Sequence, residues 1–130
     1  MLYCKKCRIL THAPCAICGR KADKLAEPDG NDAVLLISCR LHHASMIEPL
    51  LNDSGIPCYR DGALGAALSM TFGSYVELYH LYVPYALYHR AYELISALFA
   101  DDSEVISRLA DHGMTEEEFA ALPKTEESDV

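Results

Sequence analysis

The sequence predicts an α+β chain in three parts: a cysteine-rich N-terminal segment, a β-α-β-β-α body and a short, helical, acidic tail. Three observations support this. Four cysteines lie within residues 4–18, a continuous apolar run at 33–39 is bounded by turn residues, and a helical apolar stripe follows Pro84. With 130 residues, of which 51% are hydrophobic, the chain can bury one ordinary core beside the cysteine-rich segment.

The N-terminal cysteines form two Cys-x-x-Cys pairs separated by seven residues: Cys4 and Cys7, then Cys15 and Cys18. Each pair directs two thiolates at one centre, and two pairs complete a tetrahedron with no open position. The pattern therefore predicts one structural Zn²⁺ per chain. A segment this short cannot bury a core, so the metal must supply most of its folding free energy, on the order of 10 kcal/mol in small zinc peptides.

The sequence gives less support to other roles for these four thiols. Residues 1–10 carry three cations and no apolar leader, so we expect a reducing cytoplasm rather than two disulfides. Iron or a redox dithiol would use the same four sulfurs. Gly19 suits a metal knuckle because it accepts a positive φ, whereas Arg8 holds the equivalent place in the first knuckle. His12, between the pairs, is expected to be a loop residue rather than a surrogate ligand.

A turn-rich cluster at Pro28–Asp32 predicts the boundary between the first two parts. We therefore expect a metal ribbon at 1–27, a body at 32–100 and an acidic helical tail at 101–130 whose end is disordered. The longest apolar run is far too short to span a bilayer, so no membrane segment is expected.

Charge is distributed unevenly around this boundary. Residues 1–24 hold six Lys/Arg and one Asp, a formal charge of +5, whereas residues 25–130 hold five Lys/Arg and eighteen Asp/Glu, a charge of −13. The basic head could touch phosphate, but the acidic body would repel the same polyanion. Nucleic-acid binding is therefore not the preferred function, and the head is as readily explained by packing against the body.

The body reads as five elements. The run at 33–39 predicts a strand buried on both faces and central in its sheet. A short helix follows around 46–51, with Pro49 inside it, and ends near Gly55. Strands are expected at 56–60 and 75–83, and Pro84 begins a helix that reaches Phe99. Its core stripe is predicted to comprise Leu87, Ala91, Leu94, Ile95 and Leu98.

Several of these segments resemble a known family. The run from Val34, the stretch Leu50-Leu51-x-x-x-Gly55-Ile56-Pro57, and Tyr82-Val83-Pro84 before the last helix are similar to a bacterial family of putative signal-transducing domains. The resemblance covers about residues 33–99 and implies a ferredoxin-like or PII-like sandwich, without a defined activity. The cysteine pairs resemble the zinc-ribbon knuckles often fused to bacterial regulatory domains. Pro49 and the insertion at 61–74 depart from the family pattern.

The insertion at 61–74 is the first candidate functional loop, because three glycines and small side chains leave backbone N–H groups accessible. Its glycine spacing matches neither a Walker nor a Rossmann motif. By analogy of fold it stands where PII-like proteins carry their signalling loop. The alternative is an apolar flap that covers the sheet or pairs with a second subunit.

Tyrosines are concentrated near the last helix, and three of them lie beside its predicted core stripe. Aromatic residues at a core boundary are typical contact residues. We expect them to form, with apolar residues of the insertion, a surface for a protein partner or a homodimer. The predicted surface comprises Leu64, Leu68, Met70, Phe72, Tyr85, Tyr88 and Tyr92.

The remaining reactive residues carry weaker signals. His80, His89 and the pair His42-His43 have no acidic partners at ligand spacing, so boundary or surface roles are expected. Cys39 and Cys58 are expected to be small buried residues. The tail shows capping boxes at Thr115–Glu118 and at Asp101–Glu104.

These observations predict a cytoplasmic regulatory or adaptor protein that binds a partner or a small ligand and does not catalyse a reaction. One alternative is an enzyme with a cleft under the loop at 61–74 that uses a histidine or Cys39. Another is a nucleic-acid- or ribosome-associated zinc ribbon with a basic face around Lys5, Lys6, Arg20 and Lys21.

Overall fold

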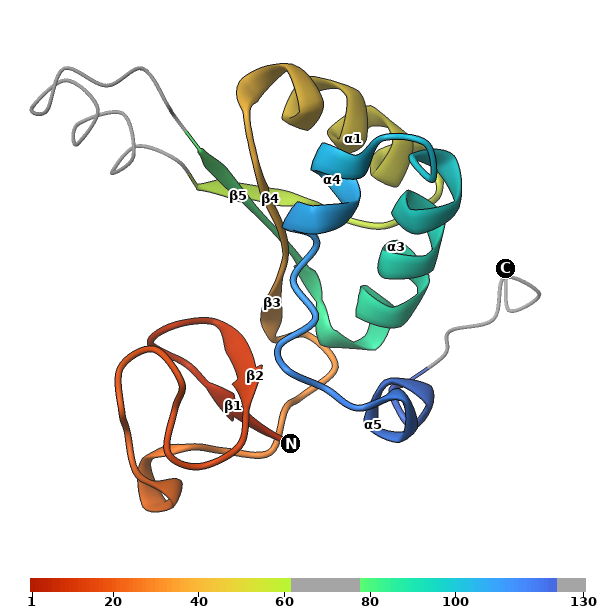
Figure 1. Cartoon of the computed structure of the whole chain (residues 1–130). Helices are drawn as coiled ribbons and strands as arrows, with labels where there is room; N and C mark the ends of the chain where they lie inside the picture. The colour runs from red at the N-terminus through yellow and green to blue at the C-terminus, as the bar shows by residue number, and fades with distance from the viewer. Residues whose placement is uncertain (62–77, 124–130) are drawn as a thin grey trace, which may run out of the picture.

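The computed structural model describes residues 1–61 and 78–123, and in this part the chain is a mixed α+β structure with two small sheets (Figure 1). Helices α1, α3 and α4 lie on one side of the larger sheet, and the cysteine-rich ribbon lies beyond one end of it. The elements are β1 (Leu2–Cys4), β2 (Ile9–Thr11), η1 (Ala22–Lys24), β3 (Ala33–Cys39), α1 (Leu41–Asp53), β4 (Tyr59–Asp61), β5 (Tyr79–Pro84), α3 (Tyr85–Leu98), α4 (Ser103–Arg108) and α5 (Glu116–Ala120).

The larger sheet has the order β3-β5-β4, and both pairings are antiparallel. The strand at 33–39 is therefore confirmed in extent, but its predicted central place is wrong, because β5 is central. β3 is still buried because its outer edge is covered. The Leu35 N–H donates to the Arg8 carbonyl (3.0 Å), and the Leu36 carbonyl accepts from the Ala110 N–H (2.8 Å). Two distant segments thus satisfy the edge that a further strand would otherwise pair.

An irregularity in β3 explains its apolar run. The register with β5 shifts between Leu35 and Ile37, so the simple alternation of faces is interrupted. As a result Leu36 and Ile37 are both fully buried, together with Val34 and Cys39.

Helix α1 is longer than the stripe at 46–51 predicted, and Pro49 lies inside it. Its end near Gly55 is confirmed. Gly55 has a φ of +78°, and the Ile56 N–H donates to the Leu51 carbonyl at 2.9 Å, which is the Schellman arrangement that a glycine after the last turn permits.

Helix α3 follows Pro84 as expected, but its core face is rotated from the predicted one. The buried residues are Tyr88, His89, Ala91 and Ile95, whereas Leu98 is 55% exposed. The physical reason is that α3 packs against the C-terminal segment as well as the sheet. The Tyr88 hydroxyl donates to the Ala110 carbonyl, and Phe119 stacks on His89 with ring centroids 4.5 Å apart.

The C-terminal segment contributes to the main core through Val105, Leu109 and Leu122. The capping box at Thr115–Glu118 is confirmed. The cap of α4 is Asp102, one residue later than predicted, and its carboxylate accepts from the N–H groups of Glu104 and Val105.

The ribbon also contributes to this core. Tyr3 and Leu10 belong to the same buried cluster as Val34 and Tyr88, and the Tyr3 hydroxyl donates to the Ala33 carbonyl at 2.6 Å. A second, smaller cluster lies inside the ribbon and consists of Cys4, Ile9, Cys15 and Leu25. The ribbon is thus packed on the body over apolar side chains, although it has some core of its own.

Within residues 1–61 and 78–123, no helix combines the length and apolar character that crossing a membrane requires.

Candidate functional site

The two cysteine turns of the ribbon have the same backbone form. In the first, the Arg8 N–H donates to the Cys4 carbonyl at 2.7 Å, and in the second the Gly19 N–H donates to the Cys15 carbonyl at 2.9 Å. Both turns end in the left-handed region, with φ of 57° at Arg8 and 76° at Gly19. Glycine adopts this conformation freely, whereas arginine does so against a steric penalty.

These turns bring the four predicted ligands together. All four sulfur atoms of Cys4, Cys7, Cys15 and Cys18 lie within 4.8 Å of one another, and the cysteines are unpaired by disulfides. The Cys4–Cys18 and Cys7–Cys15 sulfur distances are 3.7 and 3.9 Å. A tetrahedral ion with metal–sulfur bonds of about 2.3 Å requires sulfurs about 3.8 Å apart. The donor set therefore fits a four-coordinate metal ion.

The thiols of the cluster differ in how readily they ionise. Burial opposes ionisation of Cys15, but the N–H groups of Cys18 and Ile17 outweigh it, so the pKa of Cys15 falls to about 6. For Cys7, burial and then hydrogen bonds from the neighbouring thiols raise the pKa to about 12. Without a cation, four thiolates so close together cannot all ionise; a bound metal ion removes that restriction.

The candidate centre is closed to substrates. Cys4 and Cys15 are buried, and Leu2, Leu25 and Leu35 pack around the sulfurs. Four protein ligands leave no position for water or substrate, which is the arrangement of structural metal sites.

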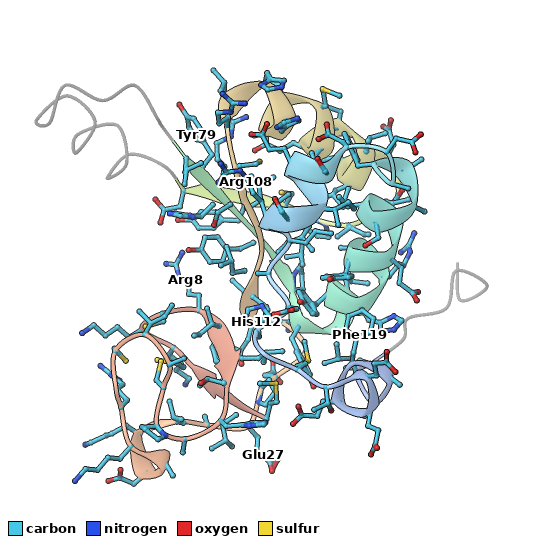
Figure 2. All side chains as sticks on the ribbon, viewed as in Figure 1. Arg8, Glu27, Tyr79, Arg108, His112 and Phe119 are labelled. Atoms are coloured by element: carbon cyan, nitrogen blue, oxygen red, sulfur yellow. The ribbon has the colours of Figure 1, made fainter. Side chains whose placement is uncertain are left out.

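The first turn reaches the sheet through Arg8. Its carbonyl accepts from Leu35 on β3, and its guanidinium lies 5.4 Å from the ring centroid of Tyr82 on β5 and 5.2 Å from that of Tyr59 on β4. Figure 2 shows this side chain extending from the ribbon toward the sheet. The hydrogen bond that the Arg8 guanidinium donates to Tyr59 raises the pKa of Arg8, and burial opposes it. A single residue, which directly follows the candidate ligand Cys7, therefore contacts all three strands.

His112 makes a second junction between the ribbon and the body (Figure 2). Its Nδ1 accepts from the Leu10 N–H at 3.2 Å, so its Nε2 carries the proton and donates to the Leu35 carbonyl at 2.8 Å. The Tyr88 ring packs edge-on against it, with centroids 5.3 Å apart. Burial lowers the pKa of His112 despite the opposing hydrogen bond to Leu35. The neutral ring is thus built into the junction.

The predicted tyrosine surface is only partly described, because Leu64, Leu68, Met70 and Phe72 lie outside the described residues. Tyr88, expected to flank the core, is fully buried. Tyr92 is half-buried against Phe119, with centroids 4.9 Å apart, and Tyr85 packs partly buried beside the core. The C-terminal segment thus covers much of the stripe that was expected to meet a partner.

The histidines and remaining cysteines are dispersed. His12 pairs with Glu118 at 2.6 Å and takes no part in the sulfur cluster. His80 Nδ1 lies 2.8 Å from the Ser38 hydroxyl, a hydrogen bond that joins neighbouring strands.

Burial raises the pKa of Cys39 to about 11 and that of Cys58 to about 12, so both are neutral thiols at physiological pH rather than nucleophiles.

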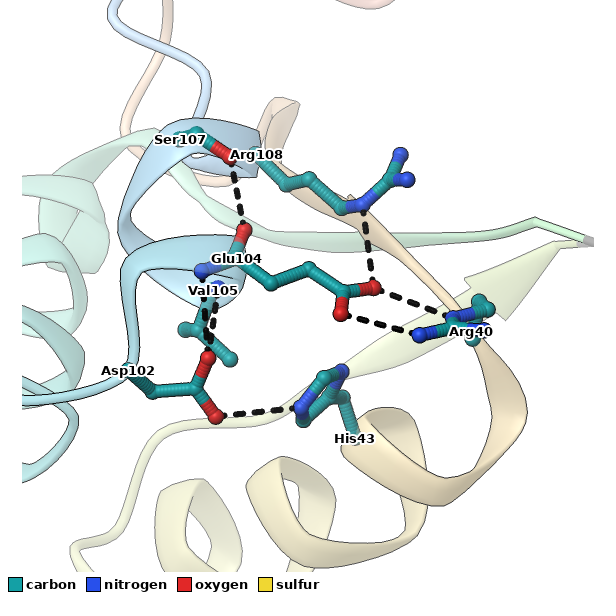
Figure 3. A network of polar contacts seen from close by, with 7 residues as sticks. All are labelled: Arg40, His43, Asp102, Glu104, Val105, Ser107 and Arg108. Carbon is teal, nitrogen blue, oxygen red and sulfur yellow. Dashed lines mark hydrogen bonds and ion pairs between the residues drawn. The ribbon is translucent and has the colours of Figure 1, made fainter.

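A polar network that sequence reasoning missed joins the start of α1 to α4 (Figure 3). Arg40 makes two hydrogen bonds to Glu104, at 2.9 and 3.0 Å, and buried His43 contacts Asp102 at 3.2 Å. Arg108 approaches Glu104 at 3.6 Å. The contacts of Arg40 with Glu104 and of His43 with Asp102 span 64 and 59 residues of sequence, so no local pattern predicts them. Arg108 and Glu104, by contrast, are four residues apart on α4.

Arg8 and His112 were also missed, for different reasons. The contacts of Arg8 could have been predicted from the sequence, because a bulky residue at a position that favours glycine is expected to have a compensating contact. The role of His112 could not have been predicted, since its two hydrogen-bond partners are backbone atoms of distant segments.

Comparisons with family models, with curated proteins and with solved structures find no match to this chain. The resemblance to the bacterial signal-transducing family therefore stays a prediction.

Proposed function

We propose that this chain is a zinc-binding regulatory or adaptor protein that acts by binding a partner or a small ligand. The observation that carries the proposal is the position of Arg8, which follows a metal ligand directly and contacts β3, β4 and β5. A closed metal centre joined in this way to a sheet is suited to setting the conformation of a binding surface. It has no open coordination position with which to catalyse a reaction.

The ligand chemistry favours zinc. Four cysteine thiolates in a tetrahedron select zinc or iron among the common cellular metals. Zinc undergoes no redox change, which suits a centre whose surroundings are packed and structural. Cys4, Cys7, Cys15 and Cys18 would hold the ion, and its chemistry there is charge neutralisation and cross-linking of the two turns.

The contacts of Arg8 indicate how the state of the ribbon could reach the body. When both knuckles are fixed, the left-handed turn at Arg8 directs its carbonyl at Leu35 and its guanidinium at Tyr59 and Tyr82. When the knuckles open, the Leu35 N–H loses its acceptor and the face of the two tyrosines loses its cover. Tyr59 is 52% exposed and Tyr82 is buried, so the Tyr59 ring is the part of this face that a partner could contact.

The sheet topology supports the predicted fold family. β3 and β4 are each antiparallel to β5 and hence parallel to one another, and α1 joins them with β5 inserted between. This is a split β-α-β unit, the building block of ferredoxin-like sandwiches. A signal-transducing role by ligand or partner binding is what the family resemblance implies for such a body.

The proposal is tested by recording the ring signals of Tyr59 and Tyr82 by NMR in the metal-loaded and metal-free protein. Both rings should shift on metal removal, and Tyr79, whose ring lies 5.1 Å from the Arg60 guanidinium and away from Arg8 (Figure 2), serves as the internal reference. An Arg8→Lys variant should retain the metal and lose part of the shift, because lysine lacks the planar group that stacks on aromatic rings. Rings that do not respond to the metal would contradict the proposal.

A further inference from the structure

The metal ribbon carries an exposed basic surface around an apolar residue. Lys5 and Lys6 lie in the turn between the first two cysteines, Ile17 lies in the turn between the last two, and Arg20 and Lys21 follow. Because the four sulfurs surround one point, these turns lie together on the outside of the centre. All five side chains are exposed, and Ile17 is 69% exposed. We call these five residues the ribbon tip.

The cations of the ribbon tip are unpaired, unlike several in the body. Within residues 1–61 and 78–123, Lys5, Lys6, Arg20 and Lys21 make no ion pair. Arg40 and Arg60, by contrast, each make two hydrogen bonds to a glutamate. Figure 2 shows nitrogen-tipped side chains extending outward around the ribbon, away from the helices. A tip of this kind fits an acidic surface with an apolar centre.

The body carries a surface of that chemistry. A shallow hollow of about 590 Å³ lies between α1, the end of α3 and the start of α4. Two of its apolar residues are exposed, Met46 at 49% and Leu98 at 55%, and Phe99 is buried beneath them. Three carboxylates line the hollow. Glu104 is already paired with Arg40 and lies 3.6 Å from Arg108, and Asp102 contacts His43, whereas Asp101 makes no ion pair within residues 1–61 and 78–123. We call this hollow the acidic groove; it is lined by Met46, Leu98, Phe99, Asp101, Asp102, Ser103 and Glu104.

The two surfaces cannot meet within one chain, because the ribbon and the α1–α4 region lie at opposite ends of the molecule (Figure 1). With four thiolates and one Zn²⁺ counted, the charge of residues 1–24 falls from the formal +5 to about +3. It is still opposite to the −13 of residues 25–130, and opposite charges would orient two copies head to tail. We propose that the ribbon tip of one copy docks in the acidic groove of a second copy, with Ile17 against Met46 and Leu98. The inference rests on the proposed function, since the metal holds the tip in shape.

The contact should be weak and salt-sensitive. Its apolar centre is small, and its charges are exposed, so screening by salt acts on them fully. A small contact of this type falls below the area of a stable interface. Association is therefore expected at high micromolar concentration and low ionic strength, and it should weaken at least tenfold when salt is raised to about 0.5 M.

The test is sedimentation velocity of the metal-loaded full chain with two sets of substitutions. The tip variant is Lys5→Glu, Lys6→Glu, Arg20→Glu and Lys21→Glu. The groove variant is Met46→Ser, Leu98→Lys and Asp101→Lys, which spares Asp102 and Glu104 because they hold α4. A matched control reverses exposed charges elsewhere, with Lys24→Glu and Glu117→Lys. The wild type and the control should associate, and each variant alone should stay monomeric.

Mixing the two variants supplies the decisive test, because the unchanged tip of the groove variant then meets the unchanged groove of the tip variant. Association should return in the mixture, to within about tenfold of the wild-type strength. A wild type that is monomeric at low salt, association that survives either variant, or a mixture that stays monomeric would overturn the inference. Metal content and circular dichroism are measured on each variant. A loaded, folded, monomeric wild type would remove this contact and leave the proposed function standing.

Discussion

The ribbon and the body are held together by different means. The body buries a continuous apolar cluster that includes Leu36, Ile47 and Ile95 at 0% exposure, whereas the ribbon's own cluster consists of four residues, two of them cysteines of the candidate metal centre. Hydrophobic burial can therefore stabilise the body, whereas we expect the ribbon to depend on a metal ion held by its four sulfurs. The comparison shows that one short chain can contain two regions with separate sources of stability. Arg8, His112, Tyr3 and Leu10 connect them.

The largest effect should come from removing the metal. A Cys15→Ser variant, or chelation of the wild type, should unfold the ribbon, since metal binding contributes on the order of 10 kcal/mol to folding in zinc peptides. Metal analysis should give one ion per wild-type chain and none in the variant. A Cys58→Ser variant, in which a cysteine far from the centre is replaced, is the matched control. Stoichiometric metal retained after loss of Cys15 would contradict the assignment.

The stability of the body should be reduced most by substitutions in its own apolar core. Ile95→Ala should reduce the free energy of unfolding by about 2–5 kcal/mol, because Ile95 is fully buried on α3. Leu98→Ala, on the neighbouring turn, should change it by less than about 0.5 kcal/mol, because Leu98 is exposed. Denaturant unfolding of the two variants compares the observed face of α3 with the one that periodicity predicts. Equal losses would favour the predicted stripe.

The junction at His112 should be sensitive to acid. The folded pKa of His112 is lowered by burial, so it lies below the unfolded value of about 6.5. Below that pH the unfolded chain binds more protons than the folded one. The stability contributed by the neutral ring is thus complete above about pH 6.5 and is lost as the pH falls toward the folded pKa.

The control for this pH dependence is His112→Gln, whose amide can donate and accept but does not titrate. The variant should unfold with a flatter pH dependence between about pH 6.5 and 5, measured together with metal content because thiolates also bind protons in acid. If the wild type and the variant share one pH profile, His112 is not the group responsible.

The smallest effect concerns the Arg8 side chain. Arg8→Ala keeps the positive φ and loses the aromatic contacts, which are worth about 0.5–2 kcal/mol. Arg8→Gly loses the same contacts but relieves the left-handed backbone, so it should be less destabilised than the alanine variant by about 1 kcal/mol. Thermal unfolding of the loaded proteins measures the difference. A glycine variant less stable than the alanine variant would show that the turn is not strained.

The parts of this structure that follow from local chemistry could be predicted from the sequence. The spacing of Cys4, Cys7, Cys15 and Cys18 specifies one centre, and the apolar run at 33–39 specifies a strand. Gly55 and the Thr115–Glu118 capping box specify helix ends, because each acts on its own turn.

The parts of the structure that depend on distant segments could not be predicted from the sequence. β3 was expected to be central because it is buried, but its edge is covered by residues 8 and 110, which no strand pattern marks. The core face of α3 was misplaced because Tyr88 finds its partner at Ala110. Contacts of this kind are set by the packing of the whole chain, and single residues such as His112 give no local sign of them.

The central claim is that the metal centre and the sheet are linked through Arg8, and amide hydrogen exchange at Leu35 tests it most directly. In the loaded wild type, the Leu35 N–H should be protected by its bond to the Arg8 carbonyl. Chelation should remove that protection, while Leu81 and Val83 on β5 stay protected within the sheet. If Leu35 exchanges at the same slow rate with and without metal, the ribbon and the sheet are independent and the account is wrong.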